Sequence, residues 1–232
     1  MHIKSKLREY AESIIIAVIL AFFIRTFIIQ AFKIPSGSMK PTLQIGDYLI
    51  VNKFIYGVKI PIIRKTIVPI SNPKRGDIVV CIYPQDRSMD FIKRVIGIAG
   101  DRIEIKNKKI YLNGRPANDN NGVYTYDRII PGTEQPRDNL GPIVVPPDDI
   151  FVMGDNRDNS YDGRFWGFVN LRDVLGKAVI IYWSWNQEES IARWDRLGHM
   201  LHLFLSRHKF KLEIVPSNNT LKKGAISYVA PH

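Results

Sequence analysis

The longest apolar run of the chain lies near its N-terminus. Residues 14–24 are all apolar, Arg25-Thr26 interrupts the run, and mostly apolar residues then resume. Counted over residues 13–32, the segment has about the length with which a helix crosses a hydrocarbon core. Its apolar residues surround the helix, which disfavours an interfacial amphipathic helix, and no small-x-small cleavage site follows, which disfavours a cleaved signal peptide. The pattern predicts an uncleaved single transmembrane helix over 13–32.

The charges around this segment predict its orientation. Residues 1–12 form a polar N-terminal tail that contains Lys4, Lys6 and Arg8. Positive charge favours the cytoplasmic side of a membrane, so we expect a cytoplasmic tail and the remainder of the chain on the outer face. Arg25 lies in the outer half of the segment, where its side chain can extend to the headgroups.

After residue 33, short apolar runs alternate with turn-forming residues. Gly-Asp pairs precede strand-like runs at residues 46–47, 76–77 and 100–101. Each pair is typical of a turn that leads into a strand. Residues 115–149 are rich in Asn, Asp, Pro and Gly and predict a long loop or small insertion. The pattern predicts a mainly β protein, with an antiparallel β-sheet domain over residues 33–190.

The C-terminal segment has a different period. Residues 191–210 place apolar side chains at helical spacing among basic residues. This spacing predicts a basic C-terminal helix that either lies on a membrane surface or packs on the β domain, and packing is the favoured alternative. Together with the tail that follows, it forms the expected segment 191–232.

The charge and the missing residue types limit the chemistry. A net charge of +11 suits anionic phospholipid headgroups or nucleic acid. Because the chain has an apolar anchor and no nucleic-acid motif, we expect phospholipid partners and no nucleic acid. No histidine lies between residues 3 and 198, which disfavours a Ser-His-Asp triad or a histidine-ligated zinc site there. Cys81, the only cysteine, lies in an apolar run and is predicted to be a buried core residue.

A serine nucleophile without histidine requires another base, and lysine is the known substitute. An ordinary lysine, with a pKa of about 10.4, is protonated at neutral pH, but burial lowers this value by up to about 3–5 units. Lys93 lies in an apolar run and, by strand alternation, shares a face with Phe91 and Val95. These neighbours would shield its amine from water. A structural ion pair or a lysine that extends to solvent is the alternative.

Two further segments carry candidate chemistry. In the first, Pro35 and Pro41 interrupt any helix and Gly37 permits a tight turn beside Ser38, although an ordinary turn is the alternative. In the second, residues 153–167 alternate acids and arginines between two strands. This segment predicts a hydrogen-bonded scaffold beneath a site, with a solvated loop or a calcium loop as alternatives. Arg157 opposes a calcium loop, because it occupies a position that requires an oxygen ligand.

Four segments in this order resemble the motifs of bacterial type I signal peptidases. They are Ser36-Gly37-Ser38-Met39 with Pro41-Thr42, Arg75-Gly76-Asp77-Ile78-Val79, Lys93-Arg94-Val95-Ile96-Gly97 with Gly100-Asp101, and Gly154-Asp155-Asn156-Arg157-Asp158-Asn159-Ser160. The resemblance implies a membrane-anchored serine endopeptidase that removes signal peptides from exported preproteins on the outer face of the bacterial cytoplasmic membrane. It implies no metal and no cofactor.

The resemblance also implies roles for particular residues. Ser38 would be the nucleophile and Lys93 the general base, while the Ser38 N–H and the Ser36 hydroxyl would form an oxyanion hole. Ser160 would orient Lys93, with Asp162 and Arg164 supporting that loop. The substrate would bind as an extended strand with small residues at the −1 and −3 positions, in pockets lined by Ile34, Pro35, Met39, Leu43, Phe91 and Ile92.

Two other functions remain open at this stage. A self-cleaving repressor-type peptidase shares the serine–lysine chemistry but requires a DNA-binding domain, and this chain has an apolar anchor instead. A membrane-tethered β domain that binds exported proteins without cleaving them would not need both Ser38 and Lys93, and both are present.

Overall fold

A computed structural model describes residues 2–59 and 66–201. Its helices are α1 (His2–Phe23) and the short α2 (Gly163–Trp166), and a π-helical turn (Ile24–Ile28) follows α1. The strands are β1 (Ile29–Lys33), β2 (Asp47–Asn52), β3 (Val58–Lys59), β4 (Thr66–Val68), β5 (Ile78–Ile82), β6 (Asp90–Ile98), β7 (Arg102–Lys106), β8 (Lys109–Leu112), β9 (Arg115–Pro116), β10 (Leu140–Val144), β11 (Asp149–Met153), β12 (Val169–Asn170), β13 (Val174–Asn186), β14 (Ile191–Ala192) and β15 (His199–Met200). Single 3₁₀ turns cover Phe54–Tyr56, Arg157–Asn159, Leu171–Asp173 and Trp194–Arg196.

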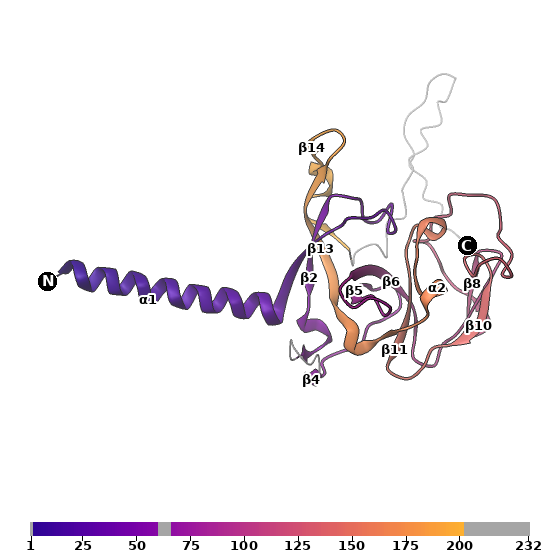
Figure 1. The fold of residues 1–232 in the computed structure, drawn as a ribbon, viewed down its shortest axis with the longest axis horizontal. Coiled ribbons are helices and arrows are strands. Elements are labelled where there is room, and N and C mark those ends of the chain that lie inside the picture. Colours follow the sequence, from indigo (N-terminus) through magenta and orange to yellow (C-terminus); the bar gives the residue numbers. More distant parts are fainter. Residues whose placement is uncertain (1, 60–65, 202–232) are drawn as a thin grey trace, which may run out of the picture.

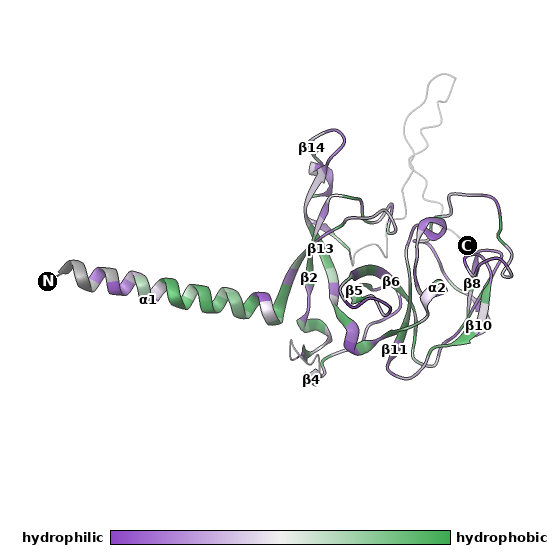
Figure 2. Ribbon diagram, viewed as in Figure 1, coloured by the Kyte–Doolittle hydropathy of each residue, from purple (hydrophilic) through white to green (hydrophobic). Residues whose placement is uncertain are grey.

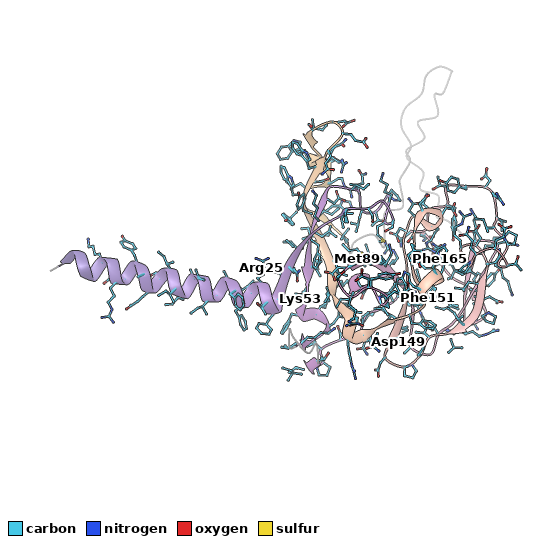
Figure 3. The ribbon with its side chains drawn as sticks, viewed as in Figure 1. Arg25, Lys53, Met89, Asp149, Phe151 and Phe165 are labelled. Atoms are coloured by element: carbon cyan, nitrogen blue, oxygen red, sulfur yellow. The ribbon has the colours of Figure 1, made fainter. Side chains whose placement is uncertain are left out.

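The N-terminal helix projects away from the β domain (Figure 1). The stretch Arg8–Ile28 is long and apolar enough to cross a membrane, and the domain buries none of it. Figure 2 shows that the hydrophobic residues gather in the second half of α1, next to the domain. Arg25 and Lys53 lie at the junction of helix and domain (Figure 3), where the Lys53 N–H donates to the Ile28 carbonyl at 2.8 Å.

The predicted limits of the anchor helix are wrong at its C-terminal end. Residues 29–33 form strand β1, which pairs antiparallel with β2 along its whole length. A run of apolar residues has the same hydropathy whether it is a helix or a strand, so the sequence pattern could not locate this transition. At the other end, α1 begins at His2 and therefore includes most of the tail predicted over residues 1–12.

The mainly antiparallel β fold is confirmed. Among the described residues, one nine-stranded sheet has the order β1-β2-β13-β5-β6-β11-β12, and β14 and β15 pair with β13. The central strand β5 is buried on both faces: Ile78 and Val80 belong to one core cluster, and Val79 and Cys81 to another. This two-sided burial explains the continuous apolar run of β5. It also confirms the prediction that Cys81 is a buried core residue.

A second sheet with the order β10-β7-β8-β9 forms a smaller lobe (Figure 1). Ile103, Ile105 and Ile110 fill its core together with residues of β11. The segment 115–149, predicted as a loop or insertion, contributes β9 and β10 at its two ends, and the residues between them are turns and irregular chain. The β3–β4 hairpin forms a separate two-stranded sheet.

The helix predicted from residue 191 is wrong for the residues that the structure describes. Residues 191–200 form β14, a 3₁₀ turn and β15, and both strands pair with the long β13. Their backbone groups are satisfied by hydrogen bonds to β13, which overrides the helical spacing of the apolar side chains. Arg196 also fixes this segment through an ion pair with the buried Asp47. The remainder of the predicted helix and tail, residues 202–232, lies outside the described residues.

Candidate active site

The segment that carries Ser38 is held between two buried anchor points. Ile34 is buried just after β1, and its N–H donates to the Asp47 carbonyl at 2.8 Å. Met39 is also buried, and its carbonyl accepts from the Leu43 N–H. Ser38 itself is only partly buried. The local sequence therefore fixes the backbone with apolar side chains and leaves the serine hydroxyl accessible.

Strand β6 brings Lys93 to this serine. The Lys93 Nζ donates to the Ser38 Oγ at 2.6 Å. The Lys93 side chain is buried, lies 5.3 Å from the centre of the Phe91 ring, and forms no ion pair with any described residue. Burial lowers the pKa of the Lys93 amine below its ordinary value, and the nearby Asp162 carboxylate opposes this shift only in part. The amine therefore has the environment of a lysine that accepts protons.

The loop after β11 fixes the segment that carries Ser38 through its backbone. The Asn156 N–H donates to the Ser38 carbonyl at 3.0 Å, and its side-chain amide donates to the Gly37 carbonyl at 3.1 Å. Gly154 allows this approach, since a Cβ at this position would lie 2.4 Å from the Ser38 carbonyl oxygen and 2.2 Å from the Ser160 Oγ. Asn156 was not singled out from the sequence, and only its place in a polar motif pointed to it.

Asp155 connects the three segments of the site. Its carboxylate accepts two hydrogen bonds from Arg94, at 2.7 and 2.6 Å, and one from the Thr42 hydroxyl at 2.6 Å. Arg94 neighbours Lys93, and Thr42 follows Ser38 by four positions. Because Asp155 is fully buried, these charge-assisted bonds are screened little by water.

Asp162 and Arg164 form a second buried pair beneath the loop. Arg164 donates to both Asp162 oxygens at 2.9 Å, and the Gly154 N–H donates to the same carboxylate at 2.9 Å. Burial alone would raise the pKa of Asp162, but the Arg164 charge and these hydrogen bonds outweigh it and hold the pKa below its ordinary value. Arg164 also donates to the Arg157 carbonyl at 2.6 Å. These hydrogen bonds connect both ends of the loop, at Gly154 and at Arg157, to the buried pair.

Ser160 lies at the site, but its predicted bond to Lys93 is not seen. Its hydroxyl is buried and has no hydrogen-bond partner among the described residues. The hydroxyl packs closely against Gly154. An orienting role for Ser160 therefore remains a prediction.

A cleft of about 780 Å³ opens beside the serine and the lysine. Most residues predicted for the site line it, namely Ile34, Pro35, Ser36, Ser38, Met39, Phe91, Ile92 and Lys93. Among the residues predicted for the substrate pockets, Leu43 is the exception: it is fully buried in the core with Met39 and does not line the cleft. Sequence reasoning missed other lining residues, among them Met89, Asn156, Asn159 and Tyr161. No group of three or more metal-ligating side chains occurs in the described part of the chain.

A second buried lysine lies close by with a different partner. The Lys177 Nζ of β13 forms a 2.6 Å ion pair with Asp77, whose carboxylate also accepts from the Tyr56 hydroxyl at 3.0 Å. Asp77 belongs to the Arg75-Gly76-Asp77 turn, and Arg75 is paired with Asp101. This tripeptide is therefore a structural turn that leads into β5.

A serine hydroxyl bonded to a buried lysine amine on the wall of a cleft is the arrangement of a serine peptidase of the serine–lysine class, here in a chain whose N-terminal helix is long and apolar enough to cross a membrane. Comparison with known proteins leads to the same class. The sequence model of a protein family described as signal peptidase, peptidase S26, matches residues 7–183 of the chain. The chain belongs to this signal peptidase family. Family membership removes the alternative of a self-cleaving repressor-type peptidase.

Curated relatives are similar over most of the chain. The chain is 34% identical over 221 residues to signal peptidase I of Pseudomonas aeruginosa, with 82% of this chain and 78% of the relative covered. It is 38% identical over 180 residues to a probable signal peptidase I-2 of Synechocystis sp., with 75% and 72% covered. A crystal structure of a signal peptidase I from Enterococcus faecalis is 27% identical, with a TM-score of 0.38, and covers 46% of this chain and 97% of that chain.

Proposed function

We propose that this chain is the serine endopeptidase that removes signal peptides from exported preproteins, with Ser38 as nucleophile and Lys93 as general base. The observation that carries the assignment is the 2.6 Å contact between the Ser38 hydroxyl and the buried amine of Lys93. A neutral amine at this distance can accept the serine proton as the oxygen attacks the scissile carbonyl. The same amine, once protonated, returns a proton to the leaving amino group. An acyl-enzyme on Ser38 results, and Lys93 then activates the water that hydrolyses it.

The developing oxyanion requires hydrogen-bond donors on the serine side. Neither the Ser38 N–H nor the Ser36 hydroxyl donates a hydrogen bond to a described residue. Both are therefore available to stabilise the tetrahedral intermediate, where one such donor contributes about 2.7–4 kcal/mol. Asn156, by holding the Gly37 and Ser38 carbonyls, orients the peptide units that carry these donors.

The edge of β6 supports binding of the substrate as an extended strand. β11 pairs with β6 only from Arg94 onward, so Phe91 to Lys93 pair with β5 alone. Backbone groups of an extended peptide can pair along such an edge. Across the cleft, Ile34 and Met39 meet Ile92 in one apolar surface, which suits small side chains at the −1 and −3 positions.

The anchor supports a proposed location on the outer face of the bacterial cytoplasmic membrane. In this orientation the basic residues that precede the apolar stretch lie on the cytoplasmic side, in contact with anionic phospholipids. The β domain and its cleft then lie outside, where exported preproteins emerge. Ser160 is proposed to donate a hydrogen bond that orients Lys93 once substrate is bound.

Cleavage of a preprotein with Ala at −3 and −1 tests the proposal. The wild type, Ser38→Ala and Lys93→Met are assayed in lipid, with Lys106→Met as a control at an exposed lysine. We expect cleavage after the −1 Ala by wild type and control, and none by the two site variants, with all four folded. Cleavage retained by Lys93→Met would identify another base. Binding without cleavage by wild type would instead indicate a tethered binding domain.

A further inference from the structure

A cluster of aromatic side chains borders the cleft beside Lys93. The Phe91 ring stacks on Tyr83 at 4.6 Å, and Tyr161 meets Tyr83 edge-on at 6.4 Å. Tyr161 also packs on Phe165, with 5.1 Å between ring centres. Of these four residues, Phe91 and Tyr161 line the cleft. Tyr161 remains 51% exposed, so much of its ring is free to contact a bound peptide.

The aromatic cluster and the apolar surface around Ile92 lie on opposite faces of β6. Ile92 packs against the core cluster that contains Ile34 and Met39, whereas Phe91 packs against the cluster on the opposite face. Successive side chains of an extended peptide also point to opposite faces. When the −1 and −3 side chains of a substrate face Ile92, the −2 side chain faces Phe91 and Tyr161.

We propose that Tyr161, together with Phe91, forms a subsite for a large apolar side chain, preferably aromatic, at the −2 position of the signal peptide. This replaces the assignment of Phe91 to the −1 and −3 pockets that the resemblance implied, because Phe91 and Ile92 lie on opposite faces of β6. This inference rests on the proposed function. Tyr161 is held by Phe165 and Tyr83 on one side and is open on the other, so its ring is pre-organised for stacking. The residue thereby selects among substrates that share the same small residues at −1 and −3.

The experiment compares two substrate pairs that keep Ala at −1 and −3. The first pair carries Phe or Ala at −2, and the second carries Phe or Ala at +1. The full-length wild type, Tyr161→Ala, Tyr161→Phe and the control Tyr182→Ala are assayed. Tyr182 is a comparably exposed tyrosine of β13 that does not line the cleft.

We expect the wild type to prefer Phe over Ala at −2 in kcat/KM. Tyr161→Ala should reduce this ratio by about 3–10-fold, the size of one aromatic contact, while Tyr161→Phe and Tyr182→Ala keep it. Tyr161→Leu, which keeps apolar bulk without a ring, should lie between them and provides a second variant should Tyr161→Ala lose its fold.

Other results would overturn the subsite. An equal loss on every substrate would mean that Tyr161 only supports its neighbour Ser160, and a change confined to the +1 pair would mean that it contacts the mature protein. A wild type that cleaves both −2 substrates equally would remove the subsite and leave the proposed function intact. No Ser38-dependent cleavage of any substrate would remove both.

Discussion

Two buried lysines lie in one row across the large sheet, and their surroundings differ. Lys177 of β13 and Lys93 of β6 both pair with Val79 of β5, one on each side. Both are nearly inaccessible, at 6% and 4% exposure. Lys177 has a carboxylate partner in Asp77, whereas among the described residues the Lys93 amine is hydrogen-bonded only to the Ser38 hydroxyl. Burial is therefore common to both lysines, and the partner distinguishes the proposed base from the structural cation.

Asp162 is the carboxylate that most raises the pKa of Lys93, and it is already paired with Arg164. Asp162 interacts electrostatically with the Lys93 amine, but its oxygens accept from Arg164 and from the Gly154 N–H. Arg164 therefore neutralises a charge that would otherwise keep Lys93 protonated. The loop contributes to the proposed chemistry by keeping its own charges paired.

The same substitution at both lysines should give the largest contrast. An arginine is always protonated, so Lys93→Arg cannot act as a base, and cleavage should fall by about 10²–10⁴-fold. Lys177→Arg keeps a cation beside Asp77 and should retain most of the activity per folded molecule. Steady-state cleavage of the Ala −1/−3 preprotein measures both. Equal losses in the two variants would contradict a distinct role for Lys93.

Replacing each lysine by methionine should affect stability in the opposite order: the loss of unfolding free energy should be large at Lys177 and absent at Lys93. Lys177→Met leaves the Asp77 carboxylate buried without its ion-pair partner, which costs about 3–5 kcal/mol of unfolding free energy. Lys93→Met removes an amine with no ion pair and should not lower stability. Urea unfolding of the two variants measures the difference. If Lys93→Met proved the more destabilising, the Lys93 amine would contribute to stability through its contact with Ser38 and would not be only a proposed base.

A milder substitution tests how the buried Asp77, the partner of Lys177, contributes to stability. Tyr56→Phe removes the hydroxyl that donates to Asp77 and leaves the ring in place. Hydrogen bonds to charged groups contribute about 1.5–3 kcal/mol, so the free energy of unfolding should fall by this amount. Activity of the folded fraction should stay at the wild-type level, since Tyr56 does not line the cleft. A drop in kcat would indicate that the two lysines are coupled.

The pH dependence should show the smallest effect. Because burial lowers the pKa of Lys93 from 10.5, kcat/KM should rise with pH as the amine of the free enzyme loses its proton. Between the lowered pKa and 10.5 the unfolded chain binds more protons at this lysine, so its contribution makes the folded state more stable as pH rises. Any stability advantage of Lys93→Met at neutral pH should therefore shrink toward pH 10.5, as unfolding at several pH values would reveal.

The sequence predicted most of the strands because turn chemistry and apolar runs agreed there. The Gly-Asp turns do lead into β2, β5 and β7. Prediction failed where one pattern fits two structures. Residues 29–33 are apolar enough to continue a membrane helix, yet they pair with β2; residues 191–200 have helical spacing, yet they fold back onto the preceding strand β13. The spacing of apolar residues within each segment carries no signal for this pairing.

The candidate site shows the same limit. Ser38 and Lys93 were singled out because the body of the chain contains no histidine, because one lysine lies in an apolar strand, and because both match motifs of the resembled family; the structure places the two side chains in contact. Leu43 was assigned to a pocket by resemblance, but burial beneath the cleft depends on packing that a motif does not encode. Asn156 and Tyr161 were missed because they line the cleft only through the folding of the loop after β11 against other segments. Their residue types carry no distinctive chemistry.

The direct continuation of the anchor into β1 has a consequence for substrate choice. Ser38 follows Ile28 by ten residues, a span of at most about 35 Å when fully extended. Residues 29–33 of this span pair with β2, and the Ile28 carbonyl accepts a hydrogen bond from the Lys53 N–H. The connection between the helix and the β domain is therefore held in one conformation. With the helix across the bilayer as proposed, Ser38 lies at a set height above the membrane surface. We expect a suitable peptide bond far from the membrane to stay out of reach, so that distance from the membrane selects substrates as well as side-chain shape.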